Sequence, residues 1–311
     1  MIPSPAVPLD ASPGTQPQAP ASLAATRPFY WSVRRELWEN RSLYIAPLVV
    51  TGLVLFATLL GMFRLPGKMR TLPADPAAAH ALVVRPFSLA PAPIMLATFL
   101  VGLFYSLDAL YGERRDRSLL FWKSLPVSDR TTVLSKASIP LGVLPGIAFA
   151  LSLVTFFTLL LLSTLVLLGN GISPARLWTE VRFVQEPLIM IYGLTVHALW
   201  FAPIYAWLLL VSAWARRTPV LWAALPLALP LFERIAFRTS FFGSLLKYRV
   251  TGAMSEAFAV APNRPGAGTL DGLSQLTPLR FLSAPGLWVG LFFAAFFLTA
   301  AVRLRRNREP I

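Results

Sequence analysis

Few side chains that could carry out chemistry lie near one another in this sequence. The chain has no cysteine and only two histidines, His80 and His197. A chain without cysteine has no disulfides, thiolate zinc sites, iron–sulfur clusters or cysteine nucleophiles. His197 lies in a long apolar run two residues after Thr195, and neither an H-E-x-x-H zinc pair nor a G-x-S-x-G nucleophile turn occurs. We therefore expect no catalytic residue and no metal site, and we predict that the chain is not an enzyme.

Phosphate binding by a Walker loop requires the frame G-x-x-x-x-G-K-[ST]. Gly67 and Lys68 are followed by Met69, and no glycine stands at the required spacing before them. The chain therefore cannot hydrolyse ATP by itself and needs no cofactor of its own. If it works with ATP, the hydrolysis belongs to another polypeptide.

Two ionisable or polar residues lie within or beside the apolar runs, where such residues are costly and are by default functional. His197 is either a neutral histidine hydrogen-bonded between helices or a proton-sensitive residue of a substrate pathway. Asp108 lies near the end of an apolar run. We expect it to pair with Arg114 or Arg115, or to line a cavity open to the inside.

The apolar runs themselves indicate a membrane protein. Of the 311 residues, 56% are hydrophobic and only 14% are charged, whereas a soluble domain is about half apolar and a quarter charged. A helix that crosses the hydrocarbon needs about 20 mostly apolar residues. We predict an all-α integral membrane protein with six transmembrane helices. The blocks are 43–63, 90–111, 137–168, 187–213, 218–237 and 284–304.

Two of these blocks are irregular. Block 137–168 is longer than one crossing, and Pro140 and Pro145 predict a bent entry. Block 218–237 has 15 uncharged residues between Arg217 and Glu233 and contains two prolines. It crosses if the helix continues to 237. The alternative is a re-entrant hairpin, which would leave five crossings.

The net charge of +14 has two readings. In a soluble protein it would indicate nucleic acid, but in a membrane protein it records basic flanks on the cytoplasmic side. With a cytoplasmic N-terminus, 16 of the 28 Lys and Arg lie inside and 12 outside, and six of those 12 lie in the long loop 233–283. Long loops contribute little to orientation. We therefore expect a multi-pass protein with both termini cytoplasmic and no nucleic-acid partner. The arginines at 303–308 are expected to anchor the last helix to anionic lipid.

The N-terminal region has two parts. Residues 1–28 are rich in proline and alanine and are expected to be a disordered tail. Residues 29–42 are expected to form an amphipathic connecting helix, because Tyr30, Val33, Leu37 and Tyr44 share one helical face. Two alternatives stay open for this helix. It either only lies on the membrane surface, or it lies there and also contacts a cytoplasmic partner. The residues expected at the membrane interface are Trp31, Arg34, Arg35 and Trp38.

The segment 111–136 places apolar residues on a charged cytoplasmic loop. Glu113 and Arg117 form an i,i+4 pair, a Leu-Leu-Phe-Trp run follows, and Pro126 ends the helix. Ser128 or Asp129 can cap the next helix. Exposed apolar surface of this size should dock on something. The two alternatives are the headgroups or its own bundle, and a soluble partner.

The run L-Y-G-E-R-R-D-R-S-L-L-F-W-K-S-L-P-V-S-D, residues 110–129, resembles the first cytoplasmic loop of bacterial type-two ATP-binding-cassette (ABC) permeases. The resemblance implies a six-helix subunit of the bacterial inner membrane. It would have an N-terminal connecting helix, a coupling helix in this loop, and re-entrant segments in the last outer loop, at 240–246 and 254–260. It also implies two ATPase subunits, carrying ATP and Mg, and a second permease copy, which would be identical in a homodimer. The implied ATPase-coupling residues are Glu113, Arg114, Arg115, Asp116, Arg117, Phe121, Trp122 and Lys123.

The resemblance implies an exporter of hydrophobic or amphipathic cargo whose second and fifth helices line the pathway. The pathway residues expected on this basis are Phe99, Phe104, Tyr105, Trp222 and Leu229, each with helix packing as its alternative role. His197, in the fourth predicted helix, is a further possible pathway residue because it is polar within an apolar run. Two other classes of function stay open. A non-transporting membrane anchor would share the docking loop, and an intramembrane enzyme would need a polar cluster that the sequence does not contain.

Overall fold

The computed structural model describes residues 21–71, 73–116, 127–259 and 272–307, and these segments are helical, joined by turns. In the described segments, the only β-type pairing is an isolated antiparallel bridge between Phe258 and Leu276. In chain order the helices are α1 (Ala21–Glu39), α2 (Ser42–Met62), α3 (Leu65–Arg70), α4 (Pro76–Leu89), α5 (Pro91–Asp108), α6 (Tyr111–Arg115), α8 (Asp129–Ser138), the π-helix η1 (Ile139–Val143), α9 (Leu144–Gly169), α10 (Ala175–Glu180), α11 (Gln185–Trp214), α12 (Pro219–Ala223), α13 (Leu225–Ala236), α14 (Phe241–Ala257), the 3₁₀ turn η2 (Leu273–Gln275), α15 (Pro278–Ser283) and α16 (Pro285–Asn307).

Five helical stretches in the described segments are long and apolar enough to cross a membrane. They are Ser42–Met62, Ala78–Arg115, Asp129–Gly169, Gln185–Trp214 and Pro285–Asn307. These stretches bear out the prediction of an all-α, multi-pass membrane protein. They match five of the six predicted blocks to within one residue at the ends, or extend them by a few residues or a neighbouring helix.

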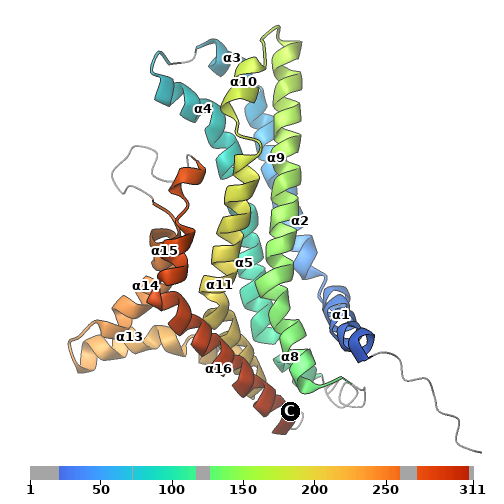
Figure 1. Cartoon of the computed structure of the whole chain (residues 1–311), viewed down its shortest axis with the longest axis vertical. Helices are drawn as coiled ribbons and strands as arrows, with labels where there is room; N and C mark the ends of the chain where they lie inside the picture. The colour runs from blue at the N-terminus through green and yellow to red at the C-terminus, as the bar shows by residue number, and fades with distance from the viewer. Residues whose placement is uncertain (1–20, 72, 117–126, 260–271, 308–311) are drawn as a thin grey trace, which may run out of the picture.

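The spanning helices form one bundle. Figure 1 shows α2, α5, α9 and α11 running side by side, while α16 packs along the C-terminal half of α11. Small residues line that contact, since Ala202 and Ala206 of α11 meet Ala294 of α16. In a membrane, small residues let helix backbones approach closely. Apolar side chains on the outer faces are exposed, as expected where lipid covers the bundle.

The connecting helix is longer than predicted. α1 begins at Ala21 and ends at Glu39. Val33 and Leu37 pack against Leu43, as their spacing predicted, but Tyr30 of the same predicted face is 57% exposed. The side chains expected at the interface are partly exposed. Arg34 lies over two of them, with Cζ 5.2 Å from the Trp31 ring and 4.6 Å from the Trp38 ring.

The helix from Asp129 to Gly169 changes its winding where proline interrupts it. Residues Ile139–Val143 form a π-helical turn that contains Pro140. Proline has no N–H and its ring clashes with the carbonyl of residue i−4, so the regular hydrogen-bond ladder cannot continue there. Where the bent entry was predicted, the structure has a π-helical turn that contains Pro140, followed by an α-helix from Leu144 that carries Pro145 in its first turn.

The segment predicted as the sixth crossing, 218–237, differs from the prediction. It forms two short helices, α12 and α13, that part at Ala224. The 12 residues of α13 extend only about 18 Å, against about 30 Å of hydrocarbon. Pro226 starts the second helix and Pro230 weakens it, which explains the break. The two short runs predicted after it, 240–246 and 254–260, instead belong largely to the single helix α14.

The chain nevertheless returns along the bundle between α11 and α16. α12 follows the C-terminal end of α11, whereas the carbonyl of Ala257, the last residue of α14, accepts a hydrogen bond from Tyr192 at 3.0 Å. Tyr192 lies about 30 Å along α11 from Ser212. α12, α13 and α14 together therefore cover one bilayer thickness as a broken path. This accounts for α1 and the last turn of α16 meeting at one end of the bundle.

Candidate functional site: a buried ion cluster and an apolar cavity

Six charged side chains meet at the end of the bundle where α1, α6, α8 and α16 converge. The cluster, here called the ion cluster, consists of three acids and three bases: Arg35, Glu36, Glu113, Asp129, Lys136 and Arg305. Lys136 Nζ lies 2.8 Å from Glu36 Oε1 and 3.1 Å from Glu113 Oε1. Arg305 continues the chain of contacts, 3.0 Å from Glu113 and 2.7 Å from Asp129. The formal charges of these six side chains balance, and Arg35 also pairs at 3.7 Å with the more exposed Glu39.

The centre of the ion cluster is shielded from solvent. Glu36 is 0% exposed and Lys136 is 2% exposed. Tyr105 of α5 donates to Glu36 Oε2 at 2.8 Å and so occupies an oxygen that Lys136 does not reach. Burial opposes the ionisation of Glu36. The ammonium of Lys136 and the hydrogen bonds from Lys136, Arg35 and Tyr105 outweigh it, so the pKa of the Glu36 carboxyl is lowered.

This lowered pKa predicts how stability depends on pH. A carboxyl whose pKa is lower in the folded state stabilises the fold fully above its ordinary pKa of 4.5 and loses this contribution as pH falls through the folded value. We expect the Tm of the parent to exceed that of Glu36→Gln at pH 7, and the difference to shrink below about pH 4.5. Thermal unfolding in detergent between pH 7 and pH 3 measures this. A difference that stays constant over the range would contradict it.

The ion cluster corrects one prediction. Arg305 was expected to anchor the chain to lipid, but it is 6% exposed and binds Glu113 and Asp129. Glu113 was expected to pair with Arg117, which lies outside the described residues. Among the described residues, Glu113 binds partners from α1, α8 and α16 that the sequence did not indicate. A partner three or four residues away on the same helix is visible in a sequence, but partners 23 to 192 residues away are not.

Both ends of the segment 117–126 are fixed to the bundle. On the N-terminal side, Ser212 Oγ of α11 accepts the N–H groups of Leu110 at 2.9 Å and Tyr111 at 2.8 Å. Arg114 donates to the carbonyl of Ala213. On the C-terminal side, Ser128 caps α8 by accepting the N–H of Thr131 at 3.1 Å, as predicted.

The remaining coupling residues divide into two groups. Arg115 Nη1 lies 3.9 Å from Asp108, the pairing expected for that acid, and 56% of the Arg115 side chain is exposed. Asp116 accepts from Arg115 at 3.0 Å and is also exposed. The others, Arg117, Phe121, Trp122 and Lys123, lie outside the described residues.

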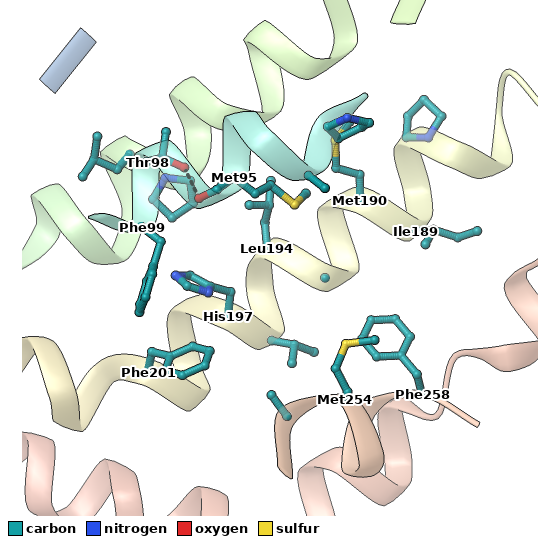
Figure 2. Close-up of a pocket in the computed structure, with 18 of the residues that line it drawn as sticks. Met95, Thr98, Phe99, Ile189, Met190, Leu194, His197, Phe201, Met254 and Phe258 are labelled. Carbon is teal, nitrogen blue, oxygen red and sulfur yellow. Dashed lines mark hydrogen bonds between the residues drawn. The ribbon is translucent and has the colours of Figure 1, made fainter. Parts of the chain in front are cut away.

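An apolar cavity of about 360 Å³ lies between α5, α9, α11 and α14. Figure 2 shows Phe99 of α5 and His197 of α11 on its wall, both predicted to be pathway residues. Three of the six methionines in the chain also line it, one each from α5, α11 and α14: Met95, Met190 and Met254. Methionine is flexible and polarisable, and it adapts to ligands of irregular shape.

The other predicted pathway residues lie elsewhere. Tyr105 belongs to the surroundings of the ion cluster. Phe104, Trp222 and Leu229 do not line the cavity and are 68%, 41% and 39% exposed. The wall opposite α5 is formed by α11 and α14, and the fifth predicted helix does not contribute. No pattern in the sequence indicates which helices form this wall, because helices that are apolar all round show no preferred face.

His197 is held by aromatic neighbours. Its Nε2 lies 3.1 Å from the Tyr205 hydroxyl, which is on the same helix two turns away, so the predicted hydrogen bond between helices is instead within α11. Phe99 contacts the imidazole edge to face at 5.4 Å between ring centroids, and Phe201 lies 4.8 Å away. The interhelical contact of His197 is therefore a ring contact.

A third polar feature joins α14 to the two helices beside it. Arg249 of α14 donates to the carbonyl of Trp200 at 3.0 Å and to the carbonyl of Gly286 at 3.1 Å. The Trp200 indole donates back to the carbonyl of Arg249 at 2.7 Å, and the guanidinium lies 4.8 Å from its ring centroid. This contact, here called the arginine junction, fixes the broken path α12–α14 against the bundle.

Comparisons with protein-family models, with curated proteins and with solved structures return no match for this chain. The family resemblance of residues 110–129 is therefore carried by those residues alone.

Proposed function

We propose that this chain is the membrane subunit of an ABC exporter of the bacterial inner membrane. Two ATPase subunits would dock on the loop that begins at Glu113, and two copies of the chain would enclose the transport pathway. The observation that carries the proposal is the ion cluster. It ties the start of this loop to α1, α8 and α16 through side chains that are almost fully buried.

The physical reason concerns the transmission of force. A loop that receives motion from a partner transmits it only if its ends are rigidly attached to the helices that move. Here the loop is attached to α11 by the hydrogen bond from Arg114 to Ala213 and by the N–H groups that Ser212 accepts. Ser128 attaches it to α8, and the ion cluster attaches it to α1 and α16. A push on residues 117–126 would therefore act on several helices at once.

The rival functions differ in what they require. A non-transporting anchor uses the same docking loop but needs no rigid link from the loop to α16. An intramembrane enzyme needs neighbouring groups for acid–base or nucleophilic chemistry, and the His197–Tyr205 pair lacks a carboxylate partner among the described residues. The exporter accounts both for the attachment of the residues that flank 117–126 to the bundle and for the cavity.

Trp122→Ala is expected to weaken binding of the ATPase at least tenfold, because buried tryptophans contribute about 2 kcal/mol or more at protein interfaces. The ATPase to use is a Walker-loop protein encoded in a neighbouring reading frame. Its affinity for the chain in nanodiscs is measured by interferometry, and ATP hydrolysis of the complex is measured in parallel. The matched control is Trp178→Ala, which removes a 45% exposed tryptophan from α10 near the opposite end of the bundle.

Unchanged affinity in Trp122→Ala would contradict the assignment of the docking loop. Normal docking without any stimulation of hydrolysis by a transported compound would favour the anchor.

A further inference from the structure

We propose that the cavity between α5, α9, α11 and α14 binds one elongated, uncharged lipid-like molecule with a hydrogen-bonding oxygen at His197. The site lies within a single subunit and does not need a second copy to complete it. Binding is independent of the proposed function, and only the description of the bound molecule as export cargo rests on it.

The shape of the cavity is the first argument. On α11 the lining residues extend from Glu186 to Tyr205, about 28 Å of helix. On the opposite side they extend from Phe87 at the end of α4 to Phe99 of α5, about 18 Å. A volume of about 360 Å³ drawn out along these helices is long and narrow, and it lies within the range of about 300–1,000 Å³ of ligand pockets. An extended hydrocarbon chain has this shape.

The chemistry of the wall is the second argument. Glu186, at the first turn of α11, is the one charged residue among those that line the cavity. The Thr98 hydroxyl donates its hydrogen bond to the carbonyls of Ile94 and Met95, so it has no donor left for a ligand. An ionised group buried deep in such a site would lack a partner of opposite charge, at a cost of several kcal/mol. The part of a ligand that lies within the cavity is therefore uncharged.

The third argument concerns the remaining hydrogen-bonding capacity. The imidazole of His197 uses Nε2 toward Tyr205, and Nδ1 has no hydrogen-bond partner among the described residues. A neutral imidazole offers one donor and one acceptor. A hydroxyl or carbonyl oxygen placed beside Nδ1 would complete this pair. Of the polar side chains in the wall, His197 thus selects an oxygen-bearing chain over a plain hydrocarbon.

The cavity has a direct way in from the side. Val250 and Met254 of α14 line it and are also 56% and 54% exposed. A wall residue that is itself exposed lies at an opening. α14 is held against the bundle by the arginine junction, by the hydrogen bond from Tyr192 to Ala257 and by the packing of Ala253 and Ala257. A molecule dissolved in the surrounding lipid would reach the cavity past Val250 and Met254 without entering water.

A photolabelling experiment on the purified full-length chain in phosphatidylcholine nanodiscs tests the proposal. The probes are a hexadecanol that carries a diazirine in its chain and the matched hexadecane diazirine. We expect the alcohol to label peptides of α5, α11 and α14, to be displaced by excess hexadecanol, and to bind about tenfold better than the hydrocarbon. Labelling spread evenly over the lipid-facing residues of α2, without displacement, would overturn the proposal.

Gly193→Leu fills the cavity without disturbing packed atoms. A Cβ at Gly193 would lie 3.8 Å from Phe258 Cζ, an ordinary contact, and the rest of the leucine would project into the cavity. We expect at least a tenfold loss of labelling. The matched control Gly52→Leu places the same side chain in open space on α2 and should label like the parent. Equal labelling of Gly193→Leu and the parent would overturn the site.

His197→Phe keeps the ring and removes its nitrogens. We expect the alcohol and hydrocarbon probes to label this variant equally. Labelling by the hydrocarbon probe should be the same in this variant as in the parent. A retained preference for the alcohol would overturn the role of His197. Because no ATPase is present, these results are separate from the docking experiment. A chain that takes the probe but binds no ATPase would contradict only the exporter.

Discussion

Lys136→Met is expected to lower the free energy of unfolding by about 3–5 kcal/mol, the usual cost of removing one partner from a buried ion pair. Lys136 is 2% exposed and stands between two carboxylates, 2.8 Å from Glu36 and 3.1 Å from Glu113. Without the ammonium, the two carboxylates of this shielded site share Arg35 and Arg305 and have one positive charge fewer than before. The energetic cost is therefore mainly that of the under-compensated acids and only partly that of the lost contacts.

Chemical unfolding in mild detergent, followed by tryptophan fluorescence, measures this loss. Lys136→Met combined with Glu36→Met removes one opposing pair together, and we expect it to recover about half of the loss or more, because a pair replaced by apolar residues costs little. Lys68→Met, at an exposed lysine of α3, is the matched control and should be near neutral. If the double variant is no more stable than Lys136→Met, the charges are not the cause.

The membrane-spanning helices were predictable because their signal is local. A run of about 20 apolar residues identifies a spanning helix without reference to the rest of the chain. The same local signal was insufficient for 218–237, where apolar composition favoured a crossing and two prolines opposed it. There the prolines decided the outcome, and the path to the far side continues through α14.

The ion cluster could not be predicted, because its members come from four separate parts of the sequence. Glu36, Glu113, Lys136 and Arg305 each looked like an ordinary charged residue near a membrane surface. For Arg305 this produced a wrong partner, and for Glu113 it left three of its partners unforeseen. The face of α1 that packs on the bundle was predicted more accurately, because the helical spacing of Val33 and Leu37 places them on one face.

The cavity was only partly predictable. His197 was identified because a polar residue within an apolar helix is unusual, and Phe99 because the family resemblance implies that the second helix lines the pathway. Tyr105, Trp222 and Phe104 have the same residue chemistry but point elsewhere. On helices that are apolar all round, the face that meets a cavity is decided by packing. Met254 was missed because α14 was expected to be two short segments.

Gly290→Leu is expected to lower the free energy of unfolding by about 3–6 kcal/mol, the sum of two hydrogen bonds from a charged group at about 1.5–3 kcal/mol each. A Cβ at Gly290 would lie 2.7 Å from Arg249 Cζ, so the guanidinium has to leave its place on α16. It then loses the carbonyls of Trp200 and Gly286, so that α14 keeps only part of its attachment to α11 and α16, through the hydrogen bond from Tyr192 to Ala257 and the packing of Ala253 and Ala257. Chemical unfolding measures the stability, and proteolysis within 240–257 reports the release of α14.

The arginine junction makes a prediction that a general packing defect does not. In an Arg249→Leu background the guanidinium is already absent, so adding Gly290→Ala should cost less than about 0.5 kcal/mol, whereas Gly290→Ala alone should cost well above that. Gly61→Ala, with nothing within 4 Å of the added Cβ, is the matched control on α2. Equal costs of Gly290→Ala in the two backgrounds would show that Arg249 does not occupy the space above this glycine. Because α14 forms one wall of the cavity, loss of the junction should also reduce labelling by the hexadecanol probe in a variant that remains folded.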